Sequence, residues 1–176
     1  MIDVKIYKEA TIFPQFTNPE LLSLAMNTMI LVCSDVVIID SATKSFYLAN
    51  RTRRPAVGLY IIGGKRHAGE TPKEGMRRKF KDETGLDVPE ERFEFVTLQE
   101  FIWEDRAQPP YTPCHVLSFT YKIELSDEEL AQINLQEGEY NSKLGLKKFN
   151  REELYAAKPR EQILDLYELI FPKKVS

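Results

Sequence analysis

Cysteine and histidine are scarce in this chain, which has two of each among its 176 residues. Cys33 and Cys114 lie far apart in a sequence that shows no export signal, so we expect reduced thiols rather than a disulfide or a metal site. His67 falls in a loop and His115 at the start of a predicted strand. At both positions we expect ordinary surface or strand-end histidines rather than catalytic ones.

The chain also lacks a large excess of either charge and any long apolar run. It has 24 Lys and Arg against 27 Asp and Glu, so its composition gives no reason to expect nucleic-acid binding. No stretch reaches the roughly 18 apolar residues of a membrane span, and residues 1–16 carry charges where a signal peptide has its apolar core. We therefore expect a cytoplasmic protein that binds neither nucleic acid nor membranes, folded as a single domain over residues 1–176.

The pattern of apolar residues predicts a mixture of strands and helices. Strands are predicted at residues 30–39, 45–49, 59–62, 93–103, 115–125 and 143–149. Helices are predicted at residues 19–26, 72–84 and 150–171, the last of them kinked or divided in two near Pro159. This order predicts an α+β fold, an α/β/α sandwich in which a mixed sheet lies between helices.

The middle helix has clear ends in the sequence. Thr71 is a helix cap, Pro72 suits the first helical position, and Glu74 completes a capping box. Gly85 suits the left-handed residue that ends a helix. One face of the helix is predicted to be buried, and a neighbouring face carries ionisable groups related by three and four positions: Lys79, Asp82 and Glu83. The alternative is a solvated face of alternating charges.

Residues 64–86 read GKRHAGETPKEGMRRKFKDETGL. The spacing of the residues Gly64, Glu70, Arg78, Asp82, Glu83 and Gly85 resembles the signature of the Nudix hydrolases, G-x5-E-x7-R-E-U-x-E-E-x-G-U, where U is a bulky apolar residue. The resemblance implies a Nudix-type α/β/α sandwich and hydrolysis of a nucleoside-diphosphate-linked small molecule with Mg²⁺. It also implies that Glu70 and Arg78 form an ion pair that fixes the loop against the helix.

Lys79 departs from this signature, which has a glutamate directly after the arginine. The substitution removes a carboxylate and adds a cation. At an effective dielectric near 20, unit charges about 4 Å apart interact by roughly 4 kcal/mol, so a cluster of several metal ions is disfavoured and one Mg²⁺ is expected. Lys79 is also a candidate for direct contact with phosphates, and it supports the alternative of an inert module that binds a nucleotide or a partner protein.

Residues 50–58, NRTRRPAVG, resemble a segment of the GDP-mannose mannosyl hydrolases. Members of this subgroup lack the same box glutamate, and in their reaction water attacks the sugar C1. The resemblance implies Mg²⁺ ligation by the Gly63 carbonyl and Glu83, with Asp82 as a supplementary acid, and a possible homodimer. It also implies that the substrate, a nucleotide sugar such as GDP-mannose, is bound by Arg51, Arg54 and Lys65.

Three points stay open from the sequence. The subgroup takes its general base, a histidine, from a loop that corresponds loosely to residues 136–143, where this chain offers Glu137 and Glu139 instead. Cleavage at phosphorus, with Asp82 and Glu83 as the main ligands, is the alternative reaction. Phe101, Trp103 and Tyr111 are candidates for stacking on a base, with core packing as the alternative.

Overall fold

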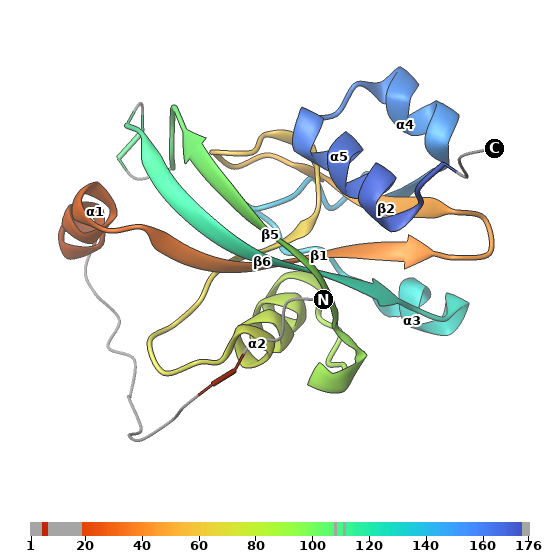
Figure 1. Ribbon diagram of the computed structural model, residues 1–176, viewed down its shortest axis with the longest axis horizontal. Coiled ribbons are helices and arrows are strands. Elements are labelled where there is room, and N and C mark those ends of the chain that lie inside the picture. The colour runs from red at the N-terminus through yellow and green to blue at the C-terminus, as the bar shows by residue number, and fades with distance from the viewer. Residues whose placement is uncertain (1–4, 7–18, 108, 111, 174–176) are drawn as a thin grey trace.

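A seven-stranded mixed sheet forms the centre of the protein (Figure 1). The computed structural model describes residues 5–6, 19–107, 109–110 and 112–173. The strands are β1 (Leu31–Asp40), β2 (Ser45–Arg51), β3 (Gly58–Tyr60), β4 (Ile62–Lys65), β5 (Glu94–Trp103), β6 (Cys114–Glu124) and β7 (Leu146–Phe149). The helices are α1 (Pro19–Thr28), α2 (Pro72–Thr84), α3 (Asp127–Gln132), α4 (Arg151–Ala157) and α5 (Glu161–Ile170), with a 3-10 helix, η1 (Glu90–Arg92).

The main path of the sheet runs β3-β2-β1-β6-β5, while β4 pairs with β1 and β7 pairs with β2. Strands β1 and β6 are parallel, and the other pairings between strands are antiparallel. The fold is therefore α+β with a mixed sheet, as the sequence predicts. Strands β1 and β2 form a hairpin, since Asp40 pairs with Ser45 across the turn between them.

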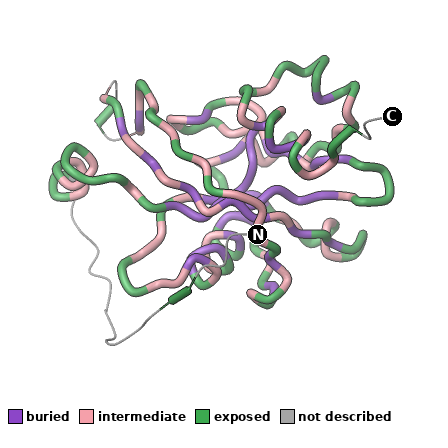
Figure 2. Tube along the Cα trace, viewed as in Figure 1, coloured by how far each residue is buried: buried purple, intermediate pink, exposed green. Residues whose placement is uncertain are grey.

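Strand β1 is covered on both faces, which explains its unbroken apolar run. Successive side chains of a strand point to opposite faces, so Val36 and Ile38 join the core beneath α2 while Val37 and Ile39 join the core beneath α4 and α5. Figure 1 shows α2 on one side of the sheet and α4 and α5 on the other, and Figure 2 shows buried residues concentrated along the central strands.

Helix α2 has the ends predicted from the sequence. The Thr71 side chain accepts from the Glu74 N–H and the Glu74 carboxylate accepts from the Thr71 N–H, and Gly85 ends the helix at φ 75°. At the C-terminus, the predicted helical stretch is divided in two, because Lys158 has a positive φ and Pro159 cannot continue α4. The prediction missed α3, although Ser126 and Glu129 form a capping box there.

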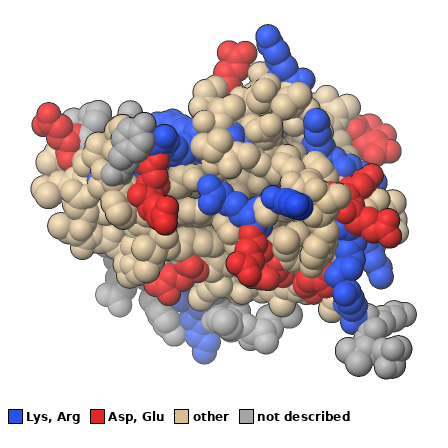
Figure 3. Space-filling view, turned by 90° about the horizontal axis from the view of Figure 1, so that it is seen from above, with Lys and Arg blue, Asp and Glu red and all other residues tan. Residues whose placement is uncertain are grey.

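Cys33 and Cys114 are free and buried. Within the part of the chain that the structure describes, no helix combines the length and the apolar character of a membrane span. On the face seen in Figure 3, basic and acidic side chains are interspersed.

Candidate functional site

The pairing of β1 with β4 sets the position of the site. Asp35 in β1 stands opposite Gly63 in β4, and the chain continues through a loop into α2, which packs on both strands. Gly63 has φ 149°, and a Cβ at this position would lie 2.3 Å from Asp35 Oδ1 and 2.5 Å from Ser34 O. Only glycine allows these two strands to approach so closely here.

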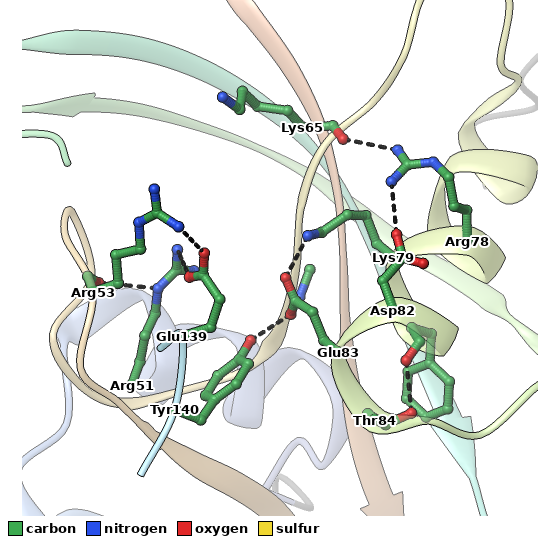
Figure 4. A network of polar contacts seen from close by, with 12 residues as sticks. Arg51, Arg53, Lys65, Arg78, Lys79, Asp82, Glu83, Thr84, Glu139 and Tyr140 are labelled. Carbon is green, nitrogen blue, oxygen red and sulfur yellow. Dashed lines mark hydrogen bonds and ion pairs between the residues drawn. The ribbon is translucent and has the colours of Figure 1, made fainter. Parts of the chain in front are cut away.

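Glu83 lies at the centre of the site with its side chain 1% exposed. Its Oε2 accepts a hydrogen bond from the Tyr140 hydroxyl at 2.5 Å and one from the Gly63 N–H at 3.2 Å. Its Oε1 lies 2.5 Å from the Lys79 ammonium, one helical turn away on α2 (Figure 4). Both oxygens of this buried carboxylate therefore have protein partners.

Asp82 does not join Glu83. Consecutive residues of a helix project about 100° apart, and Asp82 instead forms an ion pair with Arg78 at 3.2 Å, where its side chain is 51% exposed. Figure 4 shows Asp82 turned toward Arg78 while Glu83 turns toward Lys79. Of the face predicted to carry Lys79, Asp82 and Glu83 together, the structure brings together only the first and the last.

Glu70 and Arg78 form the expected ion pair between loop and helix. Arg78 Nε lies 2.5 Å from Glu70 Oε1, and the His67 N–H donates to Glu70 Oε2 at 2.7 Å. Burial would raise the pKa of Glu70, but the hydrogen bonds from Arg78 and His67 outweigh it and lower the pKa. Arg78 also donates to the Lys65 carbonyl at 3.1 Å, so this pair fixes the loop that follows β4.

A second group of charges faces Glu83 across the site. Arg51 and Arg53 both pair with Glu139, at 3.2 and 2.7 Å, and Arg54 pairs with Asp105. Glu139, a candidate base in the sequence, is therefore held by two arginines. Lys65 forms no ion pair within the described part of the chain, and Figure 4 shows its side chain extending away from α2.

Glu83 and the arginines opposite it line one cavity of about 270 Å³. Six cationic side chains contribute to its wall, against three carboxylates. The cations are Arg51, Arg53, Arg54, Lys65, Lys79 and Arg106, and the carboxylates are Asp35, Glu83 and Glu139. The remaining wall is largely apolar and includes Phe101 and Trp103, whose rings stack with centroids 5.2 Å apart. The three predicted substrate-binding residues, Arg51, Arg54 and Lys65, all lie on this cavity.

The sequence analysis overlooked Asp35. This carboxyl lies in the middle of β1 and is buried, and it accepts a hydrogen bond from the Ser118 hydroxyl at 2.5 Å. Burial raises the pKa of Asp35 to about 6, against the opposing effects of Ser118 and Arg51. A lone acid within the apolar run LVCSDVVII is a signal that could have identified it, because buried carboxyls at cavities are often functional.

Replacing Asp35 by asparagine is expected to remove a pH dependence of stability between about pH 4 and pH 6. In this window the folded protein keeps a proton that the unfolded chain has released, so the free energy of unfolding falls as pH rises. Relative to the variant, the wild type should lose about 3 kcal/mol across the window. Urea unfolding of both proteins at several pH values measures this difference. If the free energies of unfolding of the two proteins change in parallel with pH, Asp35 titrates in the folded protein as it does in the unfolded chain.

The oxygen atoms around Glu83 do not form a site that fits a resident divalent cation. Within the described ranges, no group of three or more His, Cys, Asp or Glu side chains could hold a metal ion. Lys79 places its ammonium on Glu83 Oε1, where a cation bound to this carboxylate would lie. Of the predicted metal ligands, the structure brings Gly63 and Glu83 together, while Asp82 turns to Arg78 and Lys79 pairs with Glu83.

Solved structures with the same fold come from several bacteria. The NUDIX domain of Shewanella oneidensis NrtR, complexed with ADP ribose, is 16% identical with a TM-score of 0.61, over 89% of this chain and 97% of that one. The Escherichia coli dihydroneopterin triphosphate pyrophosphohydrolase is 20% identical with a TM-score of 0.59, over 80% and 96%. A MutT/nudix family protein from Enterococcus faecalis is 16% identical with a TM-score of 0.50 over 77% of this chain, which spans about half (51%) of that protein.

These identities are low, and by themselves they show a shared fold. The sequence itself gives the stronger result, since residues 30–167 match the family of the NUDIX domain. The match runs from the start of β1 into α5 and includes α2 with its preceding loop. With this span of the sequence and this fold, the chain belongs to the NUDIX family.

Proposed function

We propose that this protein hydrolyses a nucleoside-diphosphate-linked small molecule in the cavity beside α2. The observation that carries the proposal is the composition of the cavity wall, in which cationic side chains stand opposite an apolar, partly aromatic surface. Guanidinium and ammonium groups suit diphosphate oxygens. Apolar and aromatic walls with a few polar groups are typical of sites for nucleosides and sugars.

Lys79 and Lys65 are the proposed contacts for the diphosphate. The Lys79 ammonium has three N–H donors, and its contact with Glu83 uses one of them. Lys65 forms no ion pair among the described residues and is exposed on the cavity wall. Partial loss of hydration lowers the pKa of Lys65, and the nearby cations Arg53 and Lys79 add to this effect. A bound diphosphate would relieve that repulsion.

Asp35 is the proposed proton acceptor. Its pKa of about 6 leaves it ionised at neutral pH yet basic enough to accept a proton from water, and Ser118 holds one of its oxygens in place. In the proposed step, the water oxygen bonds to the sugar C1 or to phosphorus as its proton passes to Asp35. The bond from that atom to the bridging oxygen breaks, and its electron pair leaves with the phosphate group.

Members of the NUDIX family typically use a divalent metal. For this chain, dependence on Mg²⁺ stays a prediction, and the proposed step uses no metal because the donor set around Glu83 does not fit one. A nucleotide sugar such as GDP-mannose, attacked at C1, is the finer proposal, supported by the resemblance of residues 50–58. A homodimer also stays a prediction.

The proposal is tested with a panel of nucleotide sugars and dinucleotides, each assayed with Mg²⁺ and with a chelator. Attack at C1 releases free sugar and a nucleoside diphosphate, whereas attack at phosphorus releases sugar phosphate and a nucleotide. A second function, binding without hydrolysis, is favoured by one observation, the ion pair that neutralises Glu83. Calorimetric binding of a panel member without turnover under either condition would support that second function and overturn hydrolysis.

Glu83→Gln is expected to lower turnover by about 100-fold or more while the protein stays folded. The amide keeps the shape of the side chain but loses the charge that holds Lys79 at the cavity, so the ammonium is no longer aimed at the diphosphate. Steady-state kinetics measures the effect. Glu152→Gln, the same change on the exposed surface of α4, is the matched control. Full activity in Glu83→Gln would remove this carboxylate from the mechanism.

A further inference from the structure

Arg106 is a buried cation that the proposed reaction does not use. It follows β5, lines the same cavity, and is 1% exposed. Its Nη2 donates to Asn27 Oδ1 at 2.7 Å and to Ser23 Oγ at 3.3 Å, both in α1. Its Nε and Nη1 are buried and have no hydrogen-bond partner within the described part of the chain. Two of the three guanidinium nitrogens therefore have donors without a partner among the described residues.

Arg106 has no counter-ion of its own among the residues that the structure describes. Its neighbour Asp105 accepts the backbone N–H of Arg106 at 2.8 Å, but the Asp105 carboxylate pairs with Arg54. No ion pair to Arg106 occurs among the described residues. The adjoining wall of the cavity is apolar and includes Met26 and Phe101. An unpaired charge in such surroundings destabilises the folded protein, so a function that requires the charge is a better explanation than stability.

The position of Arg106 separates it from Lys79, one of the two proposed diphosphate contacts. Lys79 comes from α2, whereas Arg106 comes from the end of β5 and is held by α1. Figure 1 shows α1 and the connection between β5 and β6 at the same end of the sheet, away from α2. The cavity touches all of these elements. A ligand whose diphosphate lies at Lys79 thus extends toward Arg106 with its other part.

We propose that Arg106 binds a second oxyanion of the ligand, a carboxylate or a phosphate remote from the diphosphate. This inference rests on the proposed function, because the diphosphate fixes the other end of the ligand. A charge-assisted hydrogen bond from Nε or from Nη1 to a carboxylate or phosphate oxygen would satisfy these buried donors. The substrate class is accordingly a nucleoside-diphosphate-linked compound with an acidic group on its sugar or on its nucleoside. The apolar wall around the fork strengthens the contact by excluding water.

The alternative is a structural role for Arg106 as an anchor for α1. The melting temperature of a substituted protein distinguishes this role from ligand binding. If Arg106 serves ligand binding, Arg106→Met removes an unpaired buried charge, so the melting temperature without ligand should stay the same or rise. If it serves as an anchor, the melting temperature should fall. Asn27→Ala is the matched control, because it removes the 2.7 Å contact with α1 and leaves the charge in place. A fall in Arg106→Met as large as that in Asn27→Ala would overturn the proposal.

Ligand binding is tested by calorimetry with two matched pairs of probes. UDP-glucose and UDP-glucuronate differ by one carboxylate, and ADP-ribose and ADP-ribose 2′-phosphate differ by one phosphate. We expect the wild type to bind the acidic member of one pair about 10- to 100-fold more tightly, and Arg106→Met to abolish this preference. The member of each pair that lacks the additional acidic group should bind both proteins equally. The pair in which the wild type prefers the acidic member identifies the anion as a carboxylate or a phosphate.

Three outcomes of the calorimetric titrations would overturn the inference. Equal affinity for both members of both pairs would remove the second anion and leave the proposed function intact. A preference that survives in Arg106→Met would assign it to another residue. Failure of the wild type to bind these four probes or any member of the nucleotide panel would overturn the proposed function and this inference together. Arg106→Lys, which keeps the charge but lacks the Nε and Nη1 donors, is titrated beside Arg106→Met and should also lose the preference.

Discussion

Gly63→Ala should lose at least about 4 kcal/mol of folding free energy, or fail to accumulate as folded protein. The added Cβ would lie 2.3 Å from Asp35 Oδ1, 2.5 Å from Ser34 O and 2.6 Å from Asp35 Cα. Two of these atoms belong to the backbone of β1, which is paired with both β4 and β6 and cannot move aside. Urea or thermal unfolding of the purified variant measures the loss.

Gly64→Ala is the matched control for this variant. Gly64 has a similar φ, 158° against 149°, so the backbone strain of a non-glycine residue is shared. Its Cβ would meet only the flexible side chain of Lys79, at 3.1 Å from Cε. We expect a loss of about 1 to 2 kcal/mol there. Equal losses at both positions would show that strain, rather than the contact with β1, sets the requirement for glycine.

Lys79→Glu is expected to destabilise the protein by about 5 kcal/mol in the presence of a chelator and to create a dependence on Mg²⁺. The variant loses the partner of a buried carboxylate and places a second negative charge beside it, since Glu83 is 1% exposed. At about 2 to 4 °C per kcal/mol, the melting temperature should fall by roughly 10 to 20 °C. Saturating Mg²⁺ should restore several degrees, because it binds the folded state between the two carboxylates.

The matched control is Lys81→Glu, the same substitution two residues further along α2. Lys81 is 57% exposed and pairs with Asp87 at the surface, so the cost there should stay near 1 kcal/mol without a response to Mg²⁺. Thermal unfolding of both variants with Mg²⁺ and with chelator makes the comparison. A Lys79→Glu variant as stable as the wild type, with unchanged metal affinity, would mean that Lys79 does not hold Glu83.

The parts of the fold that could be predicted depend on residues close together in the sequence. The capping box of α2 joins residues three apart, and the ion pair of Glu70 with Arg78 joins residues eight apart. The faces of α2 were less well predicted, because Lys79 with Glu83 and Arg78 with Asp82 are two separate pairs with the same four-residue spacing. Helical spacing alone could have distinguished these pairs.

The rest of the candidate site depends on distant contacts that no local pattern encodes. The hydroxyl that holds Glu83 comes from Tyr140, 57 residues later, and the contact of Arg106 with Asn27 spans 79 residues. Ser118 reaches Asp35 only because β6 lies parallel to β1. The order of the strands in the sheet determines which of these side chains come into contact. The sequence predicts a sheet but does not predict the order of its strands.

The ion pair between Lys79 and Glu83 gives the cavity a cation that cannot dissociate. A bound metal ion fills its site in proportion to its free concentration, whereas an ammonium attached to the backbone is present at every concentration of salt and chelator. Its local concentration is set by the length of one side chain on α2. The positive charge that faces the ligand is therefore a fixed property of the folded chain, produced when the protein is synthesised rather than drawn from the medium.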